Sequence, residues 1–150
     1  ILGFNDQHTR IHIYRAIIEG IGYALLEGAR QIEKKLGHSF SSIAISGGGS
    51  QSDAICQITA NLFNLPVYRV QTHETSGLGA AIAAFVGLGV YDTFEEGIEK
   101  MVQKTDWFEP DPEEAKIYQL LYQRIYQKTY KQLKPLYKEL RKIMKEINEE

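Results

Sequence analysis

The chain has 150 residues, which is enough for one domain with a sizeable core. Hydrophobic residues make up 43% and charged residues 24%, as in ordinary globular proteins, and the formal net charge of −2 gives no basic field that would favour nucleic acid. A single cysteine, Cys56, excludes an internal disulfide and fits a reducing cytoplasm; we expect it to be a packed, unreactive thiol.

The first half of the chain alternates helical and strand patterns. Apolar side chains recur at helical spacing over residues 9–36, and Gly37 is placed to end that helix. Residues 43–46 form a short apolar run that predicts a strand buried on both faces. Residues 53–63 predict a second helix, and residues 67–70 predict a second strand. This order is typical of parallel α/β packing.

Residues 75–91 carry no charged side chain over about 17 positions, the lower limit for a membrane span. They are rich in glycine and alanine. We therefore expect a buried helix of small residues over 76–86 followed by a turn, and not a membrane-spanning segment.

The second half predicts helices only. Thr93 and Glu96 have the spacing of a capping box, which predicts a helix that continues to Gln103. A last helix should begin at Pro112, and Pro135 should kink or interrupt it. Two strands make a poor sheet alone, so we expect further strands from elsewhere and a chain that is part of a longer protein.

Three consecutive glycines, Gly47, Gly48 and Gly49, stand where the first strand ends and the next helix begins. Glycine allows a ligand to approach the backbone closely, and the following helix offers unpaired N–H groups. The alternative is a tight turn that needs glycine only for its shape. Because ligands of open α/β sheets bind beyond the carboxyl ends of strands, loops 46–53 and 71–77 should face one cleft.

Other common sites do not fit the sequence. There is no phosphate-binding loop of the type that ends in Gly-Lys-Ser/Thr, and Ser52 stands where a dinucleotide-binding motif needs its third glycine. His8 and His12 have zinc-like spacing without an acidic residue between them, so no metal site is expected. Glu74 is either a catalytic carboxylate or a cap for the helix that follows, and the capping role is favoured.

Three motifs occur in order over the first 90 or so residues. They consist of Gly3 and Phe4 with His12, Ile13, Ala16, Ile17, Ile18 and Glu19; Ser46 to Asp53 with Gln57, Ala60 and Asn61; and Glu74 to Ala81. Together they resemble the ATP-binding C-terminal half of the FGGY carbohydrate kinases, which include glycerol, xylulose and gluconate kinases.

The resemblance implies an α/β fold: a partial C-terminal domain of the actin-like ATPase (ribonuclease H-like) type, with long helices packed on a small sheet. Residues 1–108 would form the nucleotide-binding core and residues 109–150 a helical extension. By resemblance, the adenosine seat consists of Gly47, Gly48, Gly49 and Ser52, with Gly48 and Gly49 against adenine and ribose. Many relatives have Asn at the position of Ser52.

The resemblance also implies what other parts of such a kinase would supply. The catalytic aspartate and the phosphate-binding segments are expected upstream, so no catalytic or metal-binding residue is predicted in this chain, and the fragment alone should be inactive. The full-length enzyme would use ATP and Mg²⁺, bind its sugar or polyol through an N-terminal domain, and be cytoplasmic, without nucleic-acid or membrane partners. The resemblance names no particular sugar and leaves a homodimer open.

Two other readings stay open. The first is a non-catalytic actin-like module for nucleotide binding or assembly, which would lack the upstream phosphate loop and aspartate. The second is an activator of an acyl-CoA dehydratase on the same fold. That class should carry cluster-binding cysteines, and Cys56 alone does not suit it.

Overall fold

The structure is a computed structural model that describes residues 2–148. The chain divides into two compact units, residues 1–115 and residues 116–150, which are treated separately. Across the described part, no helix is both long enough and apolar enough to cross a bilayer.

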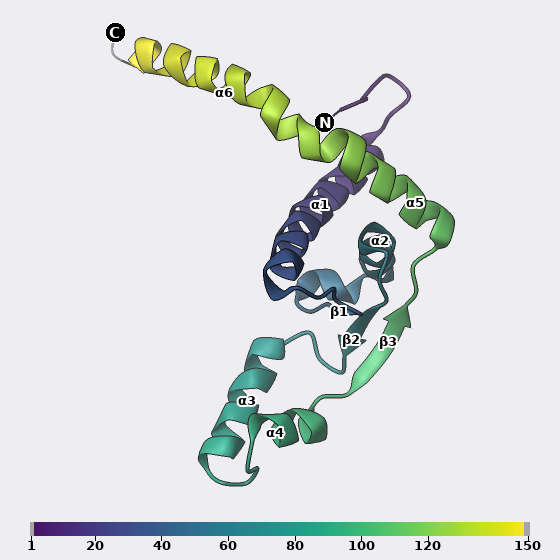
Figure 1. Cartoon of the computed structure of the whole chain (residues 1–150), viewed down its shortest axis with the longest axis vertical. Coiled ribbons are helices and arrows are strands. Elements are labelled where there is room, and N and C mark those ends of the chain that lie inside the picture. Colours follow the sequence, from purple (N-terminus) through teal and green to yellow (C-terminus); the bar gives the residue numbers. More distant parts are fainter. Residues whose placement is uncertain (1, 149–150) are drawn as a thin grey trace. The chain divides into compact units, whose positions relative to one another are not determined.

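The first unit carries most of the predicted elements (Figure 1). In chain order they are α1 (Arg10–Leu36), β1 (Ile43–Ala44), the 3₁₀ turn η1 (Gly48–Gln51), α2 (Asp53–Phe63), β2 (Val67–Val70), α3 (Thr75–Gly87), α4 (Phe94–Met101) and β3 (Lys104–Phe108). The helices α1, α2 and α3 and the strand β2 agree with the predicted ranges to within a residue. Helix α4 is shorter than predicted.

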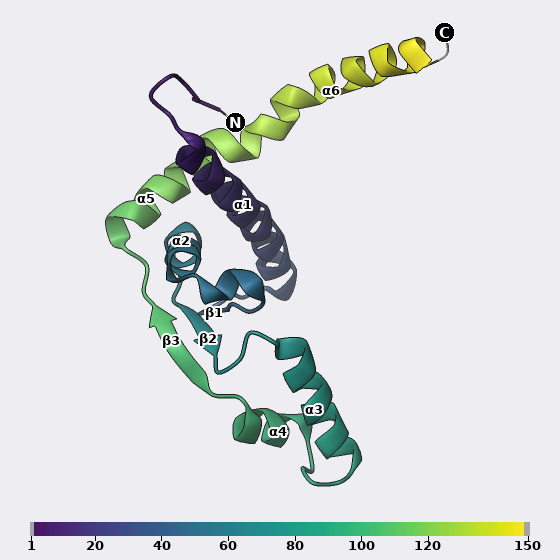
Figure 2. The same cartoon turned by 180° about the vertical axis from the view of Figure 1, so that it is seen from behind.

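The three strands form one mixed sheet in the order β1-β2-β3. Strands β1 and β2 are parallel neighbours, as predicted, with Ile43 opposite Val67. Strand β3 pairs antiparallel with β2, so the prediction of two strands only was wrong (Figure 2). The sequence pattern does not indicate β3, because this edge strand has four exposed residues at its start and therefore lacks an apolar run.

The core of the sheet lies under α2. Cys56 and Ala60 of α2 are fully buried with Val67 of β2, and partly buried apolar side chains complete this cluster: Ile43, Ile45 and Phe108. The prediction that β1 is buried on both faces was wrong, since Ala44 and Ser46 are exposed. Side chains alternate between the faces of a strand, and α2 covers one of them.

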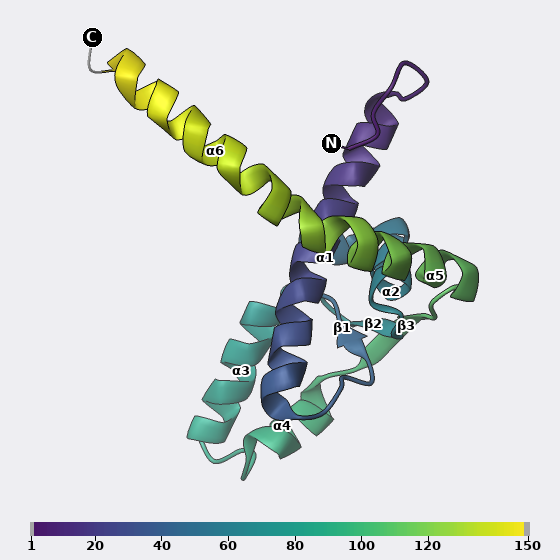
Figure 3. The ribbon, with the colours of Figure 1, turned by 45° about the horizontal axis from the view of Figure 1, so that its top comes forward.

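Helix α1 packs against α2 at a glycine. A Cβ on Gly22 would lie 2.8 Å from Cδ1 of Leu62, so the absence of a side chain lets the two helices approach closely. Leu62 and Leu26 are both buried there. Figure 3 shows α1 as the long helix that carries the N-terminal loop at one end. Its other end closes at Gly37, which adopts the left-handed conformation with φ 75°.

Helix α3 packs against α4 (Figures 1 and 2). A Cβ on Gly97 of α4 would lie 2.9 Å from Cγ2 of Ile82, so Ile82 occupies the space left by that glycine. The expectation of a buried α3 was wrong, because Ile82 is its one buried residue in the described chain. The capping box of α4 is shifted: Thr93 accepts the N–H of Glu96, but the Glu96 carboxylate accepts the N–H of Asp92. The helix ends at Met101, before the predicted Gln103.

The C-terminal helical region begins with α5 (Pro112–Leu121), which is followed by a π-helical turn (Tyr122–Tyr126) and α6 (Gln127–Asn148). Pro135 was expected to kink or interrupt this helix; it does not interrupt it, since α6 continues through Pro135, and a kink there stays a prediction. Helix α6 has no buried residue, so water can satisfy the carbonyl that Pro135 leaves without a donor. The irregularity lies instead at the π turn, where Tyr122 and Tyr126 stack with ring centroids 6.0 Å apart.

Candidate functional site

The glycine turn comprises residues 47–52, between β1 and α2. Gly47 has φ 79° and ψ −171°, a conformation that residues with a side chain rarely adopt. Gly48 and Gly49 begin η1, and Ser52 caps α2 by accepting the N–H of Ile55 at 3.4 Å. The backbone therefore requires glycine at Gly47, whereas the other two glycines need another explanation.

Hydrogen bonds hold the glycine turn against the loop after β2. The N–H of Gly47 donates to the carbonyl of His73 at 3.2 Å, and the hydroxyl of Ser50 donates to the carbonyl of Gly47 at 2.7 Å. The two loops that follow the parallel strands therefore meet, which confirms the prediction that they face each other.

Space is open above Gly48 and Gly49. Among the residues that the structure describes, a Cβ on Gly48 would meet no atom within 4 Å, and a Cβ on Gly49 would meet only Cγ2 of Ile55 at 3.9 Å. Packing within the chain does not explain these glycines. Their exposed backbone, next to the N-terminus of the 11-residue helix α2, can accept a flat or polar ligand at close range.

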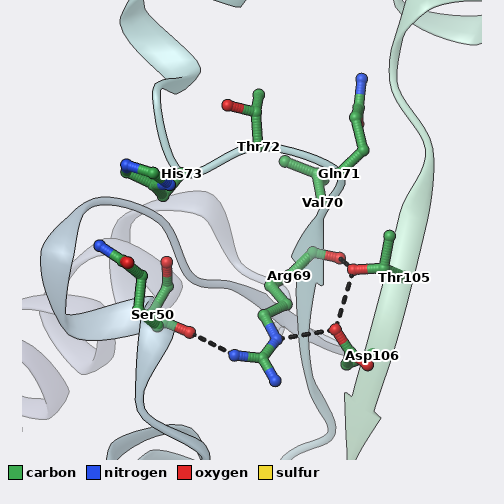
Figure 4. A pocket seen from close by; sticks show the side chains of 9 residues that line it. Ser50, Arg69, Val70, Gln71, Thr72, His73, Thr105 and Asp106 are labelled. Carbon is green, nitrogen blue, oxygen red and sulfur yellow. Dashed lines mark hydrogen bonds and ion pairs between the residues drawn. The ribbon is translucent and has the colours of Figure 1, made fainter.

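A cavity of about 290 Å³ lies beside the glycine turn (Figure 4). It is lined by Ser50 and Gln51 of the turn, residues 69–73 of β2 and its following loop, and Thr105 and Asp106 of β3. Figure 4 shows Arg69 reaching from β2 between Ser50 and Asp106. Every lining residue except Val70 has a polar side chain, and the lining comes from three separate parts of the chain.

Arg69 connects these parts. Its Nη1 donates to the carbonyl of Ser50 at 2.7 Å, its Nε donates to Oδ2 of Asp106 at 2.8 Å, and its Nη2 donates to Oδ1 of Asp53. The two carboxylates raise the pKa of Arg69, and the guanidinium lowers the pKa of Asp106, assisted by the Thr105 hydroxyl. The side chain of Arg69 is only 20% exposed.

The sequence analysis does not single out Arg69. A signal was present, because Arg69 is the one charged residue in the strand run Val67 to Val70. A charged residue that is half buried in a strand requires partners. The identity of those partners could not be read, because Asp106 lies in the strand that the sequence did not predict.

The favoured capping role of Glu74 is wrong. Its side chain makes no cap hydrogen bond and is 79% exposed, and its Oε1 lies 3.4 Å from Nε2 of His73. The Thr72 hydroxyl instead accepts the N–H of Glu74, which shapes the entry to α3. The geometry assigns no catalytic role to Glu74.

The other sequence candidates take part in packing. The rings of His8 and His12 meet edge to face at 5.1 Å, and Nδ1 of His12 accepts the N–H of Thr9 at 3.1 Å. Within residues 2–148, no group of three His, Cys, Asp or Glu side chains is arranged to hold a metal ion. Cys56 is buried, which confirms the expectation of a packed thiol, and its burial raises the thiol pKa, which favours the expected lack of reactivity.

Known proteins resemble the chain in both sequence and structure. Residues 1–88 match the C-terminal domain of the FGGY family of carbohydrate kinases. A xylulose kinase from Staphylococcus epidermidis is 37% identical over 118 residues, which cover 79% of this chain and 24% of that protein. A glycerol kinase from Geobacter sp. is 36% identical over 93 residues, which cover 62% of this chain and 19% of that protein.

A solved structure shows the same fold. Ligand-bound xylulose kinase from Lactobacillus acidophilus has a TM-score of 0.80 and 28% identity, over 93% of this chain and 28% of that one. This likeness confirms the expected fold class, the C-terminal domain of the actin-like ATPase type with long helices and a small sheet. The chain spans about a quarter of the length of the curated relatives it matches.

Proposed function

Because the chain belongs to the FGGY family of carbohydrate kinases, through that family's C-terminal domain, we propose that it is the ATP-binding part of a kinase that transfers the γ-phosphate of ATP to a hydroxyl of a sugar or polyol. The observation that carries this proposal is the open glycine turn, which lies between β1 and α2 and is hydrogen-bonded to the loop after β2. Activity would belong to the whole kinase, of which this chain is one part.

In this proposal, the adenosine end of ATP rests on Gly47, Gly48, Gly49 and Ser52. Gly47 shapes the turn through its positive φ, and Gly48 and Gly49 present bare backbone to adenine and ribose. The Ser52 hydroxyl already accepts the N–H of Ile55, and its hydrogen is left to donate to the edge of the base.

The remaining parts of the reaction are assigned to protein outside this chain. Phosphoryl transfer requires charge stabilisation at the phosphates, aided by Mg²⁺, and a base that orients the attacking hydroxyl. The described residues hold no cluster suited to Mg²⁺, so we assign the metal to the phosphates of ATP and to the remainder of the enzyme. The N-terminal domain would bind the sugar, and a location in the cytoplasm would give the enzyme access to ATP.

The predicted boundary at residue 108, between the nucleotide-binding core and the helical extension, stays a prediction.

Replacing Gly48 tests the adenosine seat. A Cβ placed on Gly48 would meet no atom of the described residues within 4 Å, so Gly48→Val should fold while the valine occupies the space proposed for adenosine. We expect affinity for a fluorescent ATP analogue to fall at least about tenfold. Gly28→Val is the matched control, because Gly28 lies in α1 with equally open space around it and outside the turn. Unchanged affinity in folded Gly48→Val would refute the assignment.

Phosphotransfer is tested on the complete gene product. It would be assayed with ATP, Mg²⁺ and a panel that includes xylulose, glycerol and gluconate, with ADP release as the readout. Turnover with one member of the panel would support the kinase proposal. Nucleotide binding without turnover on any sugar or polyol would favour the non-catalytic actin-like module instead.

A further inference from the structure

The matched family domain ends at residue 88, yet the chain that follows is hydrogen-bonded to the matched part. Polar side chains of the matched part reach residues 101–111 at several points: Gln71 bonds Met101 and Gln103, Arg69 bonds Asp106, Gln57 bonds the carbonyl of Glu109, and Asn61 accepts the N–H of Asp111. Strand β3 is therefore held by side chains as well as by its backbone ladder with β2.

Arg69 is distinctive among these contacts, because it alone also holds the glycine turn. One part of its guanidinium bonds Asp106 on β3, while the other bonds the carbonyl of Ser50 and the carboxylate of Asp53. Its guanidinium carbon also lies 5.2 Å from the ring centre of Phe108 on β3. A single partly buried side chain thus joins β3, the turn and the first residue of α2.

The glycine turn depends on such a support. Glycine-rich backbone has many accessible conformations, so a fixed turn must be held by contacts from outside it. Two such contacts are the bond from Gly47 to His73 and the bond from Arg69 to Ser50. A binding surface that is already ordered loses less entropy when its ligand arrives.

We propose that Arg69 is a positioning residue for the nucleotide. Held by Asp106 of β3, the Arg69 side chain on β2 fixes the glycine turn, so that a strand outside the matched family domain raises the affinity of the turn for ATP. The inference rests on the proposed function, because it takes the turn to be the seat of adenosine. Arg69 itself need not touch the nucleotide.

The test compares ATP affinity with stability in four variants. Arg69→Met removes the three hydrogen bonds of the guanidinium, Arg69→Lys keeps a charge that can reach fewer partners, and Asp106→Asn removes the negative charge that pairs with Arg69 on β3. Arg141→Met, an exposed position of α6, is the matched control. The readouts are the dissociation constant for a fluorescent ATP analogue, measured well below the melting temperature, and hydrogen exchange of the Ser50 and Ser52 amides.

We expect Arg69→Met to weaken binding about tenfold, Arg69→Lys and Asp106→Asn to weaken it about threefold, and Arg141→Met to leave it unchanged. Exchange of the Ser50 and Ser52 amides, which bond the carbonyls of Gly47 and Gly49, should accelerate in the same order. A purely structural role would lower the melting temperature of Arg69→Met and leave the affinity of the folded protein unchanged, and that result would overturn the proposal.

Two further outcomes are decisive. If Arg69→Met does not fold, Asp106→Asn decides, since it keeps the arginine and removes the negative charge of its ion-pair partner on β3: unchanged affinity and unchanged exchange would overturn the proposal. If the unmodified chain is folded but binds no ATP, the proposed adenosine seat fails. In that case hydrogen exchange alone tests whether Arg69 supports the turn. Exchange of the Ser50 and Ser52 amides in Asp106→Asn that equals exchange in the unmodified chain also refutes the support of the turn by β3, whereas faster exchange retains it.

Discussion

The first unit contains two strand–loop–helix segments that look alike in sequence but differ in their packing. In the first, β1 leads through the glycine turn to α2, which has buried residues along its length: Cys56, Ala60, Asn61, Leu62 and Phe63. In the second, β2 leads through residues 71–74 to α3, a fully described helix in which Ile82 is the one buried residue. Both helices are rich in apolar residues.

This difference shows that apolar composition predicts burial only where the chain supplies a surface to pack on. Helix α2 is contacted by α1, β2 and β3, whereas the main contacts of α3 are with α4. The contrast extends to the loops, since the glycine turn is held by Arg69, whereas the loop before α3 places its charged side chain, Glu74, in solvent. We expect substitutions to separate the two segments.

The largest difference should come from leucine truncation. Leu62 of α2 is fully buried against α1, so Leu62→Ala should cost about 3 kcal/mol of unfolding free energy through lost transfer energy and the cavity left behind. Leu88, at the end of α3, is 78% exposed, so Leu88→Ala should cost less than about 0.5 kcal/mol. Urea unfolding followed by circular dichroism measures both values. Equal costs would show that α3 is as well packed as α2.

Glycine-to-alanine substitutions should have opposite signs in the two segments. Gly47→Ala places a side chain at φ 79° and ψ −171°, a conformation essentially limited to glycine, and should destabilise the protein by about 1–3 kcal/mol. Gly79 lies inside α3 with no atom near its missing Cβ, so Gly79→Ala should stabilise by about 0.5–1 kcal/mol through helix propensity. The same urea titration distinguishes them, and a loss of stability in Gly79→Ala would reveal a close contact on α3.

Much of this could be predicted from the sequence, because local signals were strong. The spacing of apolar residues located α1 and α2, and the strand–glycine–helix order located the turn and its meeting with the loop after β2. Strand β3 could not be found this way, since its exposed residues carry no periodic apolar signal. Arg69 and Asp106 are 37 positions apart and meet only through the β2–β3 pairing. The burial of α3 and of β1 was overestimated because both are apolar but incompletely covered.

The smallest effect should be a pH dependence of the unfolding free energy that arises from the Arg69–Asp106 ion pair beside the first segment. The pKa of Asp106 is lowered mainly by its hydrogen bond to Arg69, so the folded protein binds this proton less readily than the unfolded chain does. A lowered pKa contributes stability above the unfolded value of about 4, and that contribution is lost as the pH falls further towards the folded value. Unfolding free energies of the unmodified chain and of Asp106→Asn should therefore differ most above about pH 5 and converge below it.

Asp6→Asn, at an exposed position of the N-terminal loop, is the matched control. A difference that stays constant from neutral to acidic pH would mean that the Asp106 charge does not support the turn, and the contrast between the two segments would then rest on apolar packing alone.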